Sequence, residues 1–175
     1  MKNFDQCLKI VLQFEGGYVD DPNDPGGETN LGVTKNVWKE WVNRPVEIGE
    51  MRQLTPELVA PLYRVKYWDA IKADDLPSGL DLCAFDCAVN QGVNRSIKFL
   101  EQSVNDDLSG VMDDDLIEKI NSLVPILLID DFTLKREMHY KMLPTFNIYG
   151  KGWMKRLDEV EDMAKQMAYS SKPII

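Results

Sequence analysis

The spacing of hydrophobic and polar positions predicts helices along almost the whole chain. Near the N-terminus, Phe4, Leu8 and Val11 recur at helical spacing and form one apolar stripe. The pair Gly16-Gly17 is expected to end this helix. Residues 18–34 contain two prolines and several acidic and amide side chains, which predict an ordered loop or a short hairpin. Alternating runs of useful length are missing from the sequence, so we expect an all-α fold.

Similar patterns predict the later helices. The motif Thr55-Pro56-Glu57 is a helix start, with Thr55 as N-cap and Pro56 in the first helical position, and this helix is expected to run to about Trp68. The last helix is expected to begin at Trp153, after the Gly150-Lys151-Gly152 stretch. This last helix is expected to cover residues 153–169. The remaining helices are expected near residues 35–41, 80–91, 95–105, 113–121 and 123–142.

The domain organisation is expected to be two regions packed together. A soft break falls near residues 91–94, and no Gly/Ser linker, internal repeat or low-complexity tract separates the two sides. We therefore divide the chain into residues 1–92 and residues 93–175, with the second region packed on the first.

Composition and charge exclude several classes of protein. The chain has 175 residues, of which 44% are hydrophobic, so it can form a real core. Its 20 basic and 29 acidic side chains give a net charge of −9. This charge argues against binding of nucleic acid and against an electrostatic membrane anchor. The longest apolar stretch, at residues 123–129, contains Pro125 and is too short to cross a bilayer, so no membrane insertion is expected.

The N-terminus and the cysteines indicate where the chain is made. Residues 1–6 have no apolar core or cleavage site, so no secretory signal is expected and synthesis is placed in the cytoplasm. Cys7, Cys83 and Cys87 are expected to be buried free thiols. A metal site built from Cys83, Cys87 and the lone His139 is the alternative, but no fourth ligand suggests itself.

The segment from residue 14 to residue 34 carries the candidate chemistry. Glu15 lies at the C-terminal end of the first helix, where the helix dipole disfavours negative charge, and this favours the protonated carboxyl that a general acid needs. The alternative is a solvated residue at a fraying helix end. Glycoside hydrolysis needs a second carboxylate, and the loop offers several, although Asp and Asn are also common turn formers. These loop acids are Asp20, Asp21, Asp24 and Glu28.

Calcium is a further alternative for this loop, because Asp21 and Asn23 followed by Gly26 mimic the start of an EF-hand. The match fails at the fifth position, Pro25, and at the twelfth, Gly32, neither of which supplies a side-chain oxygen. We therefore expect no metal and no cofactor.

Three motifs in this segment resemble the N-terminal signature of glycoside hydrolase family 108. They are Glu-Gly-Gly-Tyr at residues 15–18, Asp-Pro-Asn-Asp-Pro-Gly-Gly at 21–27 and Thr-Asn-Leu-Gly-Val-Thr at 29–34. The resemblance implies a lysozyme-like fold and an N-acetylmuramidase that cleaves the β-1,4 bond between N-acetylmuramic acid and N-acetylglucosamine. It implies Glu15 as the catalytic acid.

The spacing of Glu15, Asp24 and Thr29 also approximates the Glu/Asp/Thr triad of phage lysozymes, although the gap between Asp24 and Thr29 is one residue short. The residues expected to contact substrate are Tyr18, Asp20, Asp21 and Asn30.

The second region is similar to the small peptidoglycan-binding domain that accompanies this catalytic domain. The similarity rests on residues 82–92 and on the Gly-Trp-x-x-Arg element that contains Trp153 and Arg156. The loop after Gly110 departs from that domain's pattern, which puts its glycan-binding role in question. Seven aromatic residues are candidates for stacking on sugars: Trp38, Trp41, Tyr63, Tyr67, Trp68, Tyr149 and Trp153.

The resemblance implies binding to the glycan strands of bacterial peptidoglycan. Because neither a secretory signal nor a membrane anchor is expected, such an enzyme would need a holin-like pore or another exporter to reach the wall. We expect a monomer. Two alternatives stay open. One is a non-catalytic peptidoglycan-binding module, and the other is an interaction module associated with secretion.

Overall fold

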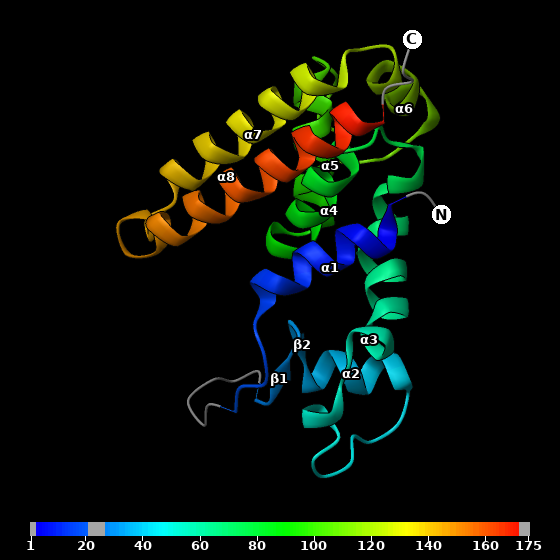
Figure 1. Ribbon diagram of the computed structural model, residues 1–175, viewed down its shortest axis with the longest axis vertical. Coiled ribbons are helices and arrows are strands. Elements are labelled where there is room, and N and C mark those ends of the chain that lie inside the picture. The colour runs from blue at the N-terminus through cyan, green and yellow to red at the C-terminus, as the bar shows by residue number, and fades with distance from the viewer. Residues whose placement is uncertain (1–2, 21–26, 172–175) are drawn as a thin grey trace. The chain divides into compact units, whose positions relative to one another are not determined.

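The computed structural model describes residues 3–20 and 27–171, and these residues confirm the predicted all-α, lysozyme-like fold class. Figure 1 shows helices joined by turns and longer loops, with one two-stranded sheet in the described residues. The chain forms two compact units, Asp5–Lys66 and Tyr67–Ile175 together with Met1–Phe4. We call Asp5–Lys66 the hairpin unit and the other the bundle unit. The predicted domain limit at residue 92 is a different division and stays a prediction.

The hairpin unit contains α1, which covers Phe4–Glu15 and begins one residue before the unit does. The predicted end of this helix at Gly16 is confirmed, because Gly16 adopts a φ of +76° that an L side chain rarely takes. The other regular elements of this unit are β1 (Thr29–Asn30), β2 (Val33–Thr34), α2 (Lys35–Val42), the 3-10 turn η1 (Met51–Gln53) and α3 (Pro56–Tyr63).

Two threonines begin the helices of the hairpin unit. Thr34 accepts a hydrogen bond from the backbone N–H of Val37 and caps α2, and Thr55 accepts one from Leu58 and caps α3. The predicted start at Thr55 is therefore confirmed. The helix that follows is shorter than predicted, because α3 ends at Tyr63 and the chain continues as a π-helical segment, η2 (Arg64–Trp68).

The bundle unit is built around α4 (Leu80–Gln91). Every residue of α4 from 80 to 88 is buried, because three further helices pack against it. Figure 1 shows α7 and α8 running side by side in this unit. The unit also contains the 3-10 turns η3 (Asp69–Ile71) and η4 (Ala73–Asp75) and four further α-helices: α5 (Val93–Ser103), α6 (Asp114–Asn121), α7 (Pro125–Met142) and α8 (Phe146–Ser170).

The predicted start of the last helix at Trp153 is wrong. Helix α8 begins at Phe146 and runs through Gly150 and Gly152 without a break. The reason is local packing. The Phe146 ring lies so close to Gly150 that a Cβ there would be 2.7 Å from it. The Trp153 ring stacks on Tyr140 of α7, with 5.1 Å between ring centroids.

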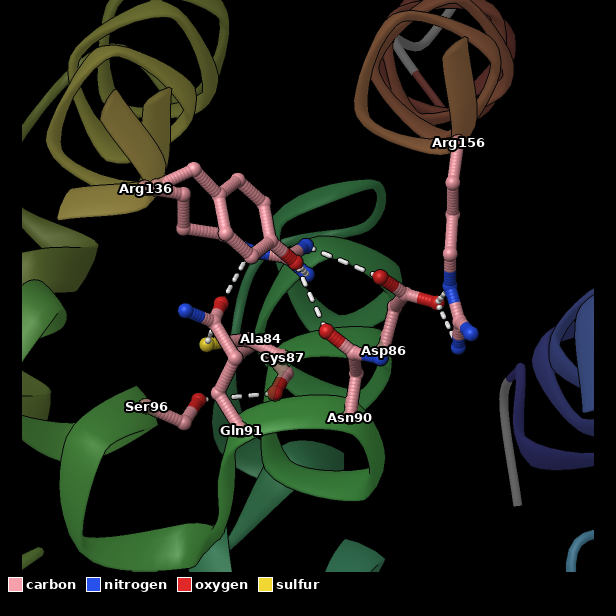
Figure 2. A network of polar contacts seen from close by, with 9 residues as sticks. Ala84, Asp86, Cys87, Asn90, Gln91, Ser96, Arg136 and Arg156 are labelled. Carbon is pink, nitrogen blue, oxygen red and sulfur yellow. Dashed lines mark hydrogen bonds and ion pairs between the residues drawn. The ribbon is translucent and has the colours of Figure 1, made fainter. Parts of the chain in front are cut away.

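A buried ion-pair network joins α4, α7 and α8 (Figure 2). Asp86 is fully buried on α4. Its Oδ2 accepts a 2.9 Å hydrogen bond from Nη1 of Arg136, and its Oδ1 accepts a 2.7 Å bond from Nη2 of Arg156. Arg136 also donates to the hydroxyl of Tyr140 and to the side-chain oxygen of Gln91. Figure 2 shows the two arginines reaching Asp86 from opposite sides, so one carboxylate fixes the positions of α7 and α8 against α4.

All three cysteines are buried thiols that form no disulfide, as predicted. Burial raises the pKa of the Cys87 thiol to about 11 and also raises that of Cys83, so neither supplies a thiolate at neutral pH. Within residues 3–20 and 27–171, no helix is both long enough and apolar enough to cross a bilayer.

The network predicts a large and specific loss of stability. Asp86→Ala leaves the Arg136 guanidinium buried without its carboxylate, and this should lower the free energy of unfolding by about 3–5 kcal/mol. Asp131→Ala is the matched control. It removes a carboxylate from the half-exposed pair with Lys135 on α7, which should cost about 1 kcal/mol or less. Urea denaturation followed by circular dichroism measures both. Equal losses in the two variants would contradict the role of Asp86 in holding α4, α7 and α8 together.

Candidate active site

Glu15 is the last residue of α1, and its side chain is half-buried. Its carboxylate lies against the turn between the two strands of the hairpin. An ideal Cβ built on Gly32 would stand 2.9 Å from Oε2 of Glu15 and 2.5 Å from the hydroxyl oxygen of Tyr63. The carboxylate therefore occupies space that opens only because residue 32 has no side chain.

The turn itself has a backbone that suits this contact. Leu31 and Gly32, its two central residues, have φ values of +50° and +73°, as a type I′ hairpin turn requires. Leu31 is a costly residue at positive φ. Its carbonyl accepts a 2.8 Å hydrogen bond from the hydroxyl of Tyr63, which is buried at the end of α3. Tyr63 thus holds the turn in place beside Glu15.

Backbone hydrogen bonds also join the residues that follow Glu15 to the hairpin. Val19 and Thr29 exchange two backbone hydrogen bonds of 2.8 Å each. Thr29 also pairs with Thr34 across the hairpin, and its hydroxyl donates to the carbonyl of Gly27 at 3.5 Å. The predicted hairpin within residues 18–34 is confirmed, and it brings Thr29 next to the chain segment that leaves Glu15.

The buried side chain of Asn30 ties the hairpin to η1. Its amide nitrogen donates a 2.8 Å hydrogen bond to the carbonyl of Met51, and Met51 is itself fully buried. Asn30 therefore fixes η1 relative to β1. Its expected contact with substrate stays a prediction.

Tyr18 lies at the centre of a polar cluster. Its hydroxyl donates to Oε1 of Glu28 at 2.9 Å, and Nζ of Lys35 pairs with the other carboxylate oxygen of Glu28 at 2.6 Å. The hydrogen bond from Lys35 holds the pKa of Glu28 below its usual range, so Glu28 is ionised at neutral pH and is a poor candidate for the acid. The guanidinium carbon of Arg52 lies over the Tyr18 ring, 4.5 Å from its centroid.

Of the remaining loop acids, the structure describes only Asp20. Asp20 is exposed. The pKa of Tyr18 is raised mainly by burial and that of Lys35 mainly by its hydrogen bond to Glu28, and the charge of Asp20 adds a smaller contribution to both. Asp21 and Asp24 lie outside the described residues, so their predicted roles stay predictions.

The aromatic candidates divide by burial. Trp38, Tyr63 and Trp68 are buried core residues, which leaves no exposed ring face for a sugar. In the bundle unit, Trp153 stacks on Tyr140, and Tyr149, which is exposed, packs against Trp153 at a tilt.

Three residues of the site were not predicted as such from the sequence: Gly32, Tyr63 as a support for the turn, and Arg52. The positive-φ turn Leu31-Gly32 offered a signal for Gly32, because Gly is strongly preferred in such turns. The contacts of Tyr63 and Arg52 join residues more than thirty positions apart, and no local pattern encodes them.

Comparisons with known proteins agree with this arrangement. The family model described as glycosyl hydrolase 108 matches residues 8–92, which include Glu15, the hairpin and α4. SagA of Brucella abortus, whose structure is solved, is 34% identical to this chain and superposes on it with a TM-score of 0.84 over 97% of each chain. The chain belongs to the glycosyl hydrolase 108 family. None of the curated proteins matches it significantly. Membership in a family of glycosyl hydrolases makes a carboxyl group held at a structured turn the first candidate for the catalytic acid.

The contact between Gly32 and Glu15 predicts a graded series of alanine variants. Gly17→Ala meets open space at ordinary φ, so it should change the free energy of unfolding by about 0.5 kcal/mol or less. Gly16→Ala also meets open space but needs positive φ, which should cost about 1–2 kcal/mol. Gly32→Ala adds crowding against Glu15 and Tyr63 to the same backbone strain, and should cost about 2–4 kcal/mol.

Thermal or urea unfolding of the three variants measures the series. A Gly32→Ala variant no less stable than Gly16→Ala would show that Glu15 does not need the space beside the turn.

Proposed function

We propose that this chain is a peptidoglycan hydrolase of the N-acetylmuramidase type. Its substrate would be the glycan strand of bacterial peptidoglycan, cut at the β-1,4 bond between N-acetylmuramic acid and N-acetylglucosamine. The family membership supports glycoside hydrolysis in general. The motif in which Glu15 stands supports the choice of this substrate.

The observation that carries the proposal is the packing of the Glu15 carboxylate against the hairpin turn. A general acid must be held in one orientation to protonate a leaving oxygen. The end of α1 and the glycine turn supply that orientation, and Tyr63 fixes the turn. In the proposed reaction, Glu15 donates its proton to the glycosidic oxygen as the bond to the anomeric carbon breaks.

A second carboxylate would stabilise the oxocarbenium-like state or activate the attacking water. We propose Asp24 for this role, with Asp20 or Asp21 as the next candidates. Thr29 would position the water or that carboxylate. The backbone hydrogen bonds between Thr29 and Val19 hold Thr29 beside the segment that carries Asp20. This arrangement supports the role proposed for Thr29.

Residues 93–175 are proposed to assist binding to the wall. In this region, the backbone N–H of Gly110 and the hydroxyl of Ser109 both donate to the buried carboxylate of Glu101. These bonds give the Gly110 loop, which departs from the pattern of the related wall-binding domain, a defined conformation.

The role of Glu15 predicts that Glu15→Gln loses hydrolysis while keeping the fold. The amide cannot donate a proton as an acid does, so the rate should fall by about 10²–10⁴-fold or more. Glu40→Gln, on the exposed side of α2 in the same unit, changes the net charge equally and should keep full activity. The assay is release of reducing ends from purified Gram-negative sacculi, with the products identified by mass.

Muramic-acid reducing ends from wild type and Glu40→Gln, but not from Glu15→Gln, are the expected result. Equal release from Glu15→Gln would move the acid elsewhere. Binding to sacculi without release by any variant would favour the non-catalytic wall-binding module. Binding to a protein partner that is unchanged in Glu15→Gln would favour the secretion-associated module.

The role of Thr29 predicts a smaller effect that depends on its hydroxyl group. Thr29→Val keeps the branched shape and the backbone pairing but removes the hydroxyl, so kcat should fall about tenfold, the equivalent of about 1.4 kcal/mol. Thr29→Ser restores a hydroxyl and should recover most of the rate. Steady-state kinetics on soluble glycan strands measure both variants. Full activity of Thr29→Val would remove Thr29 from the reaction.

A further inference from the structure

Arg52 presents a positive charge at the candidate site of a strongly acidic chain. Its side chain is exposed, and its guanidinium lies over the ring of Tyr18, which follows Glu15 by three residues. Three residues of chain span at most about 11 Å, so Tyr18 stays close to the candidate acid.

The backbone under Arg52 is held firmly. Met51 and Leu54, on either side of it, are buried, and the carbonyl of Met51 accepts the hydrogen bond from Asn30. The Arg52 side chain therefore extends from a backbone position that is held in place in η1 beside β1.

The ring under Arg52 is held as well. The Tyr18 hydroxyl donates to Glu28, and Lys35 fixes the other oxygen of the Glu28 carboxylate. Both carboxylate oxygens of Glu28 thus have partners of their own. In the described part of the chain, no carboxylate forms an ion pair with Arg52.

A guanidinium carries five N–H donors, more than its contact with Tyr18 uses. These donors form a planar fork that matches a carboxylate in a bidentate manner. A polysaccharide that carries carboxylates would meet repulsion from a chain of net charge −9. A local cation next to the acid would reverse that repulsion where the substrate binds.

We propose that Arg52, supported by Tyr18, binds a carboxylate of the muramyl residue and so helps to select muramic-acid strands over neutral glycans. This inference rests on the proposed muramidase function. The carboxylate has two possible sources with the same chemistry. One is the lactyl group of muramic acid when it is free, and the other is the stem peptide attached to that group.

Three forms of one glycan strand separate the two sources. The first form carries stem peptides, the second is stripped by an amidase and carries the free lactyl carboxylate, and the third is stripped and has that carboxylate converted into an amide. Arg52→Ala is compared with wild type on each form. Lys39→Ala, which removes one exposed cation of α2 in the same unit, is the matched control.

We expect Arg52→Ala to raise KM about tenfold or more on one carboxylate-bearing form and to leave KM on the amidated form unchanged, since a hydrogen bond to a charged group is lost only where the carboxylate is present. A defect confined to the peptide-bearing form identifies the stem peptide, and a defect confined to the stripped form identifies the lactyl group. Arg52→Lys should recover part of the loss, because it keeps the charge without the fork. Lys39→Ala should behave as wild type on all three forms.

Calorimetric binding of the same strands in a Glu15→Gln background, with and without Arg52→Ala, gives a readout that needs no turnover. If wild type releases no reducing ends, the proposed hydrolysis fails, and the binding data still decide the role of Arg52. An equal loss of affinity on all three forms would show that Arg52 only supports Tyr18, and unchanged affinity on all three would also overturn the proposal.

Discussion

The contact between the Glu15 carboxylate and the Leu31-Gly32 turn is the constraint on which the hairpin unit depends. It requires a residue without a side chain at position 32, because a Cβ there would stand within 3 Å of both Glu15 and Tyr63. It also requires a turn with two consecutive positive φ values, one of them at Leu31. The hydrogen bond from Tyr63 to the Leu31 carbonyl offsets that strain. Through this contact, α1, the hairpin and α3 meet at the carboxyl group that we propose as the catalytic acid.

Charge is organised locally within the hairpin unit rather than by the overall composition. Glu28 is neutralised by Lys35 and by its hydrogen bond from Tyr18, so this acidic residue adds little repulsion at the site. The charge of Glu50 is compensated in a similar way. Hydrogen bonds from Arg44, from the backbone of Glu47 and from Trp38 lower its pKa to about 2. The exposed guanidinium of Arg52 lies over the Tyr18 ring. If the proposal for Arg52 holds, this residue gives an anionic substrate a positive contact on a chain of net charge −9.

The features that local sequence encodes were predictable. Gly16-Gly17 ends α1, Thr55-Pro56 begins α3, and the residues around Leu31-Gly32 form a short hairpin, since each depends on neighbours within a few positions. The position of Glu15 at a helix end follows from the same signals. The start of α8 could not be predicted in this way, because the glycines at 150 and 152 favour a break and the ring of Phe146, with the stacking of Trp153, overrides it.

Contacts between segments far apart in the sequence could not be predicted either. Asp86 stands in an apolar helix, and only the fold shows that Arg136 and Arg156 enclose it from α7 and α8. Tyr63 looks like an ordinary core aromatic, and Arg52 like an ordinary surface cation. Their roles come from where the chain places them, on the hairpin turn and over Tyr18.

The most direct measurement is a crystal structure of the Glu15→Gln variant with a muramic-acid-containing tetrasaccharide bound. We expect the saccharide beside the hairpin, with a glycosidic oxygen within hydrogen-bonding distance of the residue 15 side chain. A saccharide bound away from the end of α1, with residue 15 out of reach of any glycosidic oxygen, would contradict the assignment of this turn as the hydrolytic site.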